Sequence, residues 1–155
     1  MEPQAFKQSL ISLLTEAYGL SDAPTGFFLD SGRSGLFGQI GKIDAKVASD
    51  QIEPDHETIS GHCRHLLYTF EIFLAFENGE RPTPDWAASW VPQIVDEAEW
   101  DKLRAALKSA YDLFIEKVEA RTEWPQPAVG AGMMMLAHTV YHVGVIDKMI
   151  TISSE

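Results

Sequence analysis

The segment AGMMMLAHTVYHVGVIDKMI, residues 131–150, is the most apolar stretch of the chain and decides how its fold is interpreted. Its apolar residues lie nearly all round a helix of 3.6 residues per turn, which is the pattern of a helix buried in a core. It predicts a helix over about 130–150. Two histidines, His138 and His142, interrupt the apolar run with a spacing of four residues.

A second apolar segment, GHCRHLLYTF at 61–70, carries another pair of histidines, His62 and His65. The surrounding stretch is apolar on most sides and predicts a largely buried helix over about 57–77. Asp55 is the expected N-cap of this helix, and the Asn-Gly pair after it is the expected stop.

Two further segments have one apolar face each. Residues 3–18 predict an amphipathic helix, and a second one is expected over about 96–120, with charged residues opposite its apolar stripe. Asp96 and Glu99 have the spacing of a capping box at the start of the second. The remaining segments are expected to be loops, apart from one or two short helical turns within 36–52.

These patterns together predict an all-α protein. Four long helices, two of them buried, favour an antiparallel four-helix bundle with a short extra helical segment between its first two helices. The chain of 155 residues has the usual length of one domain, so we expect a single domain over 1–155.

The composition and the N-terminus favour a cytoplasmic protein. The net charge is −11, which repels phosphate backbones and anionic membranes and disfavours nucleic-acid binding. The single cysteine, Cys63, excludes an internal disulfide. The N-terminus lacks the order of a signal peptide, and we expect no apolar run of the roughly 18 residues that would suggest a membrane span.

The histidine pairs indicate a metal site. Residues three or four apart share a helix face, so His138 and His142 can bind one ion. His65 lies about eight residues into its helix, and the other two lie about eight and twelve into theirs, which places all three at similar depths. Burying several uncompensated imidazoles costs free energy, and a shared metal ion would satisfy them together.

The alternative is that these histidines are ordinary core residues. In that case they would bond to backbone carbonyls or to nearby tyrosines such as Tyr68 and Tyr141. The segment HTVYH lacks the glutamate of the metalloprotease arrangement. Cys63 is expected in the core, the fifth histidine, His56, at the surface, and the four tryptophans in packing roles.

The quoted segments, with DWAASW and DEAEWDKLRAAL between them, resemble the DinB-like superfamily from about residue 35 to the C-terminus. The resemblance implies a four-helix bundle, often dimeric, in which three histidines hold zinc or nickel. The implied ligands are His65, His138 and His142. His62 is left open as an alternative match, a supporting partner or a fourth ligand.

The resemblance also implies a function. Characterised members include thiol-dependent transferases and isomerases that use a low-molecular-weight thiol together with the metal, and hydrolase-like chemistry is a related expectation. No residue stands out as a catalytic base. The alternatives are a metal- or ligand-binding module and a non-catalytic dimeric scaffold. Self-association is also expected from the first helix and the adjoining segment GFFLDSGRSGLFG, residues 26–38.

Overall fold

The computed structural model describes the whole chain except residues 1–2, 20–25, 28, 31, 53–55 and 155. Within that part of the chain every regular element is helical and no strand occurs, which confirms the all-α prediction. The long helices are α1 (Pro3–Tyr18), α4 (Ile59–Glu77), α5 (Glu97–Ala120) and α6 (Gln126–Ser153). The short ones are α2 (Leu36–Ile40), α3 (Ala45–Ser49) and the 3₁₀ turn η1 (Ala88–Trp90).

The chain divides into two compact units, and each is described separately. The first unit comprises residues 1–41 and 115–147, and the second comprises 42–114 and 148–155. Both α5 and α6 contribute residues to each unit.

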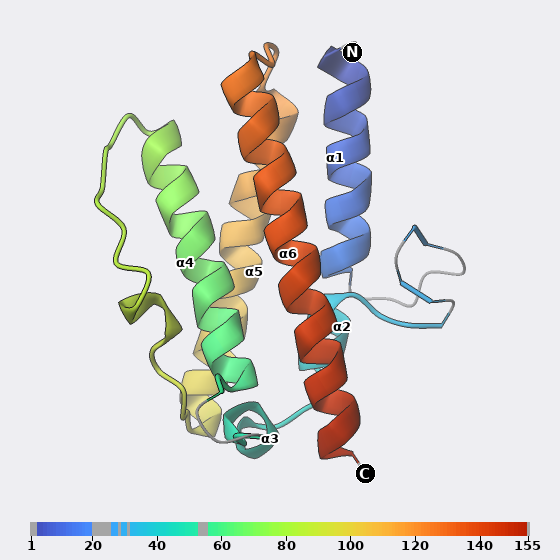
Figure 1. Cartoon of the computed structure of the whole chain (residues 1–155), viewed down its shortest axis with the longest axis vertical. Helices are drawn as coiled ribbons and strands as arrows, with labels where there is room; N and C mark the ends of the chain where they lie inside the picture. Colours follow the sequence, from blue (N-terminus) through green and yellow to red (C-terminus); the bar gives the residue numbers. More distant parts are fainter. Residues whose placement is uncertain (1–2, 20–25, 28, 31, 53–55, 155) are drawn as a thin grey trace. The chain divides into compact units, whose positions relative to one another are not determined.

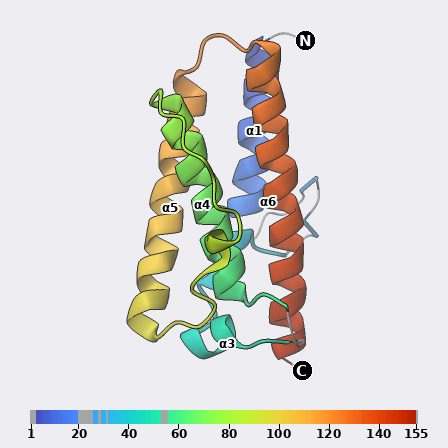
Figure 2. The same ribbon diagram turned by 60° about the vertical axis from the view of Figure 1, so that its left-hand side comes forward.

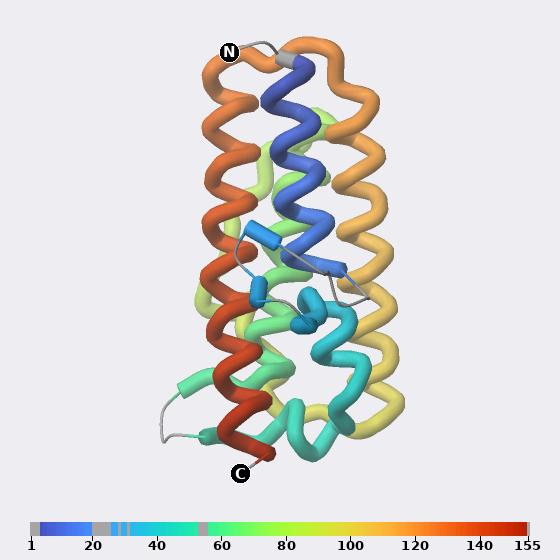
Figure 3. The backbone as a smooth tube through the Cα atoms, turned by 90° about the vertical axis from the view of Figure 1, so that its right-hand side faces the viewer, coloured from blue at the N-terminus to red at the C-terminus, as the bar shows by residue number. Residues whose placement is uncertain are grey.

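In the first unit, α1 lies beside α6 (Figure 3). A Cβ added at Gly132 on α6 would lie only 2.9 Å from Leu10 on α1, so the small residue permits this close approach. The Tyr18 hydroxyl and Thr139 Oγ1 form a buried hydrogen bond of 3.3 Å between the same two helices. Both packing and a polar contact therefore determine which face of α6 lies against α1 in this unit.

In the second unit, α4 supplies much of the core. Ile59, Cys63 and Phe70 are fully buried, and Phe114 of α5 packs against Phe70 with ring centroids 5.3 Å apart. The segment after α4 runs back along that helix as far as η1 (Figures 1 and 2). An apolar helix is thus covered on one side by a loop that carries two tryptophans.

The beginnings of the helices test the expected caps. The reciprocal box at α5 is confirmed, because Asp96 Oδ1 accepts from the Glu99 N–H at 2.8 Å and Glu99 Oε2 accepts from the Asp96 N–H at 2.9 Å. The N-cap of α4 is Thr58, whose hydroxyl accepts from the Gly61 N–H. The expected cap, Asp55, lies outside the described residues.

The start of α6 differs from the expectation. The helix begins at Gln126 rather than near 130, and Pro127 lies in its first turn. Proline is tolerated there because the first helical N–H groups have no partner within the helix. The expected loop after α5 is correspondingly shorter.

The length and composition of α6 also correct the expectation about apolar runs. No Asp, Glu, Lys or Arg occurs from Gln126 to Ile146, and α6 is long and apolar enough to cross a membrane by that measure alone. Core helices of soluble proteins pass the same test, and 33% of its apolar window is buried.

Candidate metal centre

His138 and His142 lie one turn apart on α6, and their rings meet. The two Nε2 atoms are 3.0 Å apart, with ring centroids at 4.5 Å and planes inclined by 80°. His142 is buried and His138 is half-buried. The predicted pairing of these two residues is confirmed.

The geometry of this pair can be compared with that of metal ligands. Two nitrogens bound to one tetrahedral metal, each at roughly 2.0–2.1 Å, lie about 3.3 Å apart. The 3.0 Å between the two Nε2 atoms is close to that value, and it also fits one N–H···N hydrogen bond. The pair is therefore spaced to share either a proton or an ion.

On one side of this pair the residues of α6 are buried, and on the other side α6 is exposed to solvent. Thr139, Val143 and Ile146 are buried, whereas Tyr141 is 63% exposed. The Tyr141 ring contacts His142 edge-on, with centroids 4.9 Å apart. The tyrosine expected as an alternative hydrogen-bond partner thus touches the imidazole through its ring.

Burial favours the neutral form of two of the histidines. Desolvation lowers the pKa of His138 below its usual value. It also lowers the pKa of His62, where the nearby Glu57 carboxylate opposes part of the effect. Metal ions bind the neutral imidazole, so burial acts in the direction that metal binding requires.

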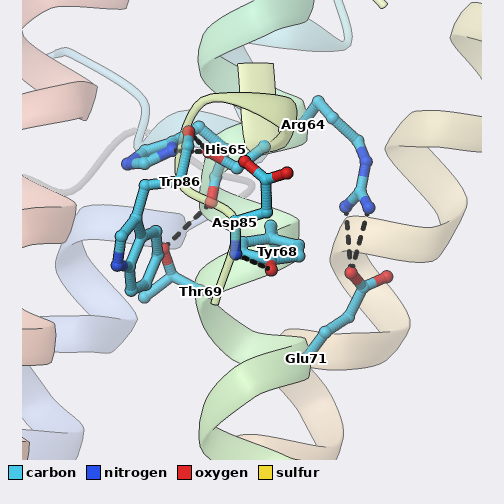
Figure 4. Close-up of polar contacts among 8 residues, drawn as sticks. Arg64, His65, Tyr68, Thr69, Glu71, Asp85 and Trp86 are labelled. Carbon is cyan, nitrogen blue, oxygen red and sulfur yellow. Dashed lines mark hydrogen bonds and ion pairs between the residues drawn. The ribbon is translucent and has the colours of Figure 1, made fainter. Parts of the chain in front are cut away.

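His65 is buried on α4, in the second unit. Its Nδ1 is 2.6 Å from Ser89 Oγ. The indole ring of Trp90 stacks on the imidazole with centroids 4.0 Å apart and planes only 5° apart. The ring of Trp86 meets the same imidazole with centroids 5.9 Å apart, and Figure 4 shows Trp86 beside His65. Residues of the 80–95 loop therefore surround this histidine.

The loop is fastened to the start of α4 by hydrogen bonds. The Gln93 side chain accepts from both the backbone N–H and the hydroxyl of Thr58, at 2.8 and 2.9 Å. The Ser60 hydroxyl donates to the Gln93 carbonyl at 2.6 Å. A Cβ at Gly61 would lie 2.3 Å from Gln93 Oε1, so a glycine at this position leaves room for the clamp.

The other candidate residues on α4 lie close to the same loop or in the core. His62 is buried and meets Trp90 edge-on at 5.2 Å. The hydroxyl of Tyr68 accepts from the Asp85 N–H at 2.9 Å, which is a structural role in the loop. Cys63 is fully buried, and burial raises the pKa of its thiol to about 12, with Arg104 opposing. His56 is exposed, as expected.

His138 and His142 offer two imidazole nitrogens to one ion within the first unit, and His65 is the third predicted ligand. Imidazole suits zinc, nickel, copper and iron alike, so the donor set does not define the metal. The structure places His65 in the second unit and the other two in the first.

Sequence reasoning missed two residues beside His65. Ser89 and Trp90 lie in DWAASW, which was expected to be part of a loop with packing tryptophans. A loop has no period from which a contact with a helix 24 residues earlier could be read. The only available signal was the presence of two tryptophans in a short segment otherwise rich in small residues.

No protein-family model, curated protein or solved structure matches the chain. The class that the described residues define is an all-α protein with a candidate three-histidine metal centre. The resemblance to the DinB-like superfamily stays a prediction from sequence motifs.

Proposed function

We propose that the protein is a metal-dependent enzyme with a DinB-like four-helix bundle, in which His65, His138 and His142 hold one divalent metal ion. The observation that carries the proposal is the His138–His142 pair, whose Nε2 atoms lie 3.0 Å apart on one face of α6. Two ligands on successive turns of a rigid helix need little rearrangement to bind an ion.

The donor set supports a catalytic rather than a structural ion. Three protein ligands leave a coordination position open, whereas structural zinc sites use four. A metal held in this way lowers the pKa of a bound water or thiol toward neutrality. The three imidazoles would position that ion, and the buried environment of His142 would limit access of bulk water to it.

The state of Cys63 bears on the class of reaction. Its thiol is buried and has a pKa of about 12, so it stays protonated and out of reach of a substrate. Thiol chemistry would therefore use a thiol from outside the chain. We propose a transferase or isomerase reaction with a low-molecular-weight thiol, zinc or nickel as the metal, and a cytoplasmic location.

We also propose that the protein is a homodimer. Met133, Met134 and Tyr141 are exposed large side chains on a stretch of α6 that carries no charge. A second copy of the chain could cover this face without desolvating any charged group. The net charge of −11 disfavours nucleic acid as the partner.

Metal stoichiometry tests the site. Untagged protein prepared without chelator should contain close to one zinc or nickel per chain by elemental analysis. His142→Ala and His65→Ala should lose most of it, whereas His56→Ala, at an exposed histidine, should keep it. Wild-type protein that takes up neither metal would refute the proposed function.

Activity is tested separately from binding. Metal-loaded protein should accelerate the reaction of a small thiol with an electrophile, and the metal-free protein should not. If the metal binds at the three histidines and no turnover follows with a panel of thiols and electrophiles, the protein is a metal-binding module and the enzymatic part of the proposal is wrong.

A further inference from the structure

We infer that Ser89 is a positioning residue that fixes the tautomer of His65, so that Nδ1 carries the ring proton and Nε2 is the nitrogen that binds metal. The tautomer follows from hydrogen bonds within the second unit alone. Its role in metal binding rests on the proposed function.

The hydroxyl of Ser89 makes two short hydrogen bonds. It donates to the backbone carbonyl oxygen of Trp86 at 2.6 Å. The same oxygen lies 2.6 Å from Nδ1 of His65. Ser89 is almost fully buried, with 1% of its surface exposed, so these partners are not exchanged for water.

Counting protons fixes the direction of the second bond. A serine hydroxyl has a single proton to donate, and a backbone carbonyl can only accept. The proton of Ser89 is therefore directed to the Trp86 carbonyl, and the hydroxyl oxygen must accept from His65. If Ser89 donated to Nδ1 instead, two oxygen atoms would lie 2.6 Å apart with no proton between them.

The neutral imidazole of His65 consequently has its proton on Nδ1 and its lone pair on Nε2. A chain of bonds runs from the Nδ1–H through the Ser89 hydroxyl to the Trp86 carbonyl, and such chains polarise each member. Metal-binding histidines typically donate their second ring N–H in this way, which orients the ring and increases its basicity.

The elements around Ser89 hold it in position. The Asp85 carboxylate accepts from the Ala88 N–H at 3.0 Å at the start of η1, and the Thr58–Gln93 clamp fastens the segment that follows it. Trp90 stacks on the imidazole and maintains its plane. Turning the His65 ring over would bring a carbon atom opposite Ser89 Oγ and lose the 2.6 Å hydrogen bond.

The tautomer can be measured without any metal. In chelator-treated protein labelled with ¹⁵N, long-range proton–nitrogen spectra at pH 8 distinguish a protonated from an unprotonated ring nitrogen. We expect His65 to have a protonated Nδ1 and an unprotonated Nε2. A protonated Nε2 in wild-type protein would overturn the inference.

Variants then connect the tautomer to metal affinity. Ser89→Ala should shift His65 toward the Nε2-protonated form and weaken zinc binding about 10–100-fold in competition with a chromophoric chelator. Ser89→Thr, which keeps the hydroxyl, should restore both readouts. Ser60→Ala is the matched control, because it removes another buried hydroxyl bonded to the same loop but leaves the His65 contact intact.

The outcomes separate this inference from the proposed function. If the wild-type tautomer is as expected but no metal binds, the metal function fails and the structural assignment of Ser89 stands. If metal binds and Ser89→Ala leaves both the tautomer and the zinc affinity unchanged, Ser89 has no positioning role even though the metal function holds. If Ser60→Ala changed the His65 tautomer and the zinc affinity as much as Ser89→Ala does, Ser89 would contribute only to the general stability of the protein.

Discussion

Trp90 stacks face to face on His65, with ring centroids 4.0 Å apart and planes 5° apart. Face contact of this kind over a whole imidazole restricts both rotation and tilt of the ring. The orientation of the His65 ring therefore depends on a residue of the loop. Changes in that loop should alter the orientation of the imidazole more than they disturb the helix α4.

Removal of the Trp90 ring should reduce both the stability of the protein and its affinity for zinc. Trp90→Ala is expected to lower the free energy of unfolding by roughly 1–3 kcal/mol through lost packing. It should also weaken zinc binding, because His65 would lose a planar support. Urea unfolding and chelator competition measure the two effects. Trp86→Ala, at a residue that is 47% exposed, should reduce stability and zinc affinity less, and equal effects would contradict the special role of Trp90.

The close contact between Gly61 and Gln93 predicts that alanine at position 61 is destabilising, which is the opposite of what helix propensity alone predicts. Alanine is a better helix former than glycine, but a Cβ at Gly61 would meet the Gln93 amide at 2.3 Å and displace the clamp on Thr58. Gly61→Ala should therefore destabilise the protein by about 1–2 kcal/mol.

A matched change exists on α6. Nothing lies within 4 Å of a Cβ built at Gly144, so Gly144→Ala should stabilise by about 0.5–1 kcal/mol. Thermal unfolding of both variants is the measurement. A stabilising Gly61→Ala would show that Gln93 moves aside at no cost.

Two histidines with lowered pKa values make the stability of the protein depend on pH. Burial lowers the pKa values of His62 and His138 in the folded protein, so between those values and about 6.5 the unfolded chain binds more protons. The stability that the neutral forms of His62 and His138 contribute is fully present above about pH 6.5. It is lost as the pH falls through the pKa values of these residues in the folded protein. Urea unfolding of metal-free protein from pH 8 to 5 should show this decline, and His62→Gln should reduce its slope. A flat profile would contradict the depressed pKa values.

Cys63 should be inert in the folded protein. Its thiol has a pKa of about 12 and is fully buried, and the thiolate is the reactive form. A chromogenic disulfide reagent at pH 8 should label it slowly in native buffer and rapidly in denaturant. Fast labelling of the native protein would mean that the α4 core opens readily.

Self-association should depend on the exposed face of α6. Sedimentation at micromolar concentration is expected to show a dimer, and Met134→Glu should shift it toward the monomer by placing a charge on an apolar interface. Ile94→Glu, at an exposed apolar residue of the second unit, serves as the control and should leave the dimer intact. A wild-type monomer would rule out the dimer.

Features that depend on near neighbours in the chain could be predicted from sequence. The apolar periods located α1, α4, α5 and α6, because a buried helix face repeats with the helical turn. The Asp96–Glu99 box needs only four consecutive residues, and the His138–His142 contact needs only one turn of helix. Their geometry is set by backbone hydrogen bonds between residues close in sequence.

Features that depend on distant residues were decided only by tertiary structure. Thr58 caps α4 while also bonding to Gln93, which lies 35 residues away. The contact of His65 with Ser89 and its stack on Trp90 depend on where an irregular loop returns along α4, and no local pattern encodes that path. The helix could therefore be predicted to present an imidazole, but which ring nitrogen holds the proton follows from a hydroxyl that the folded loop brings beside it.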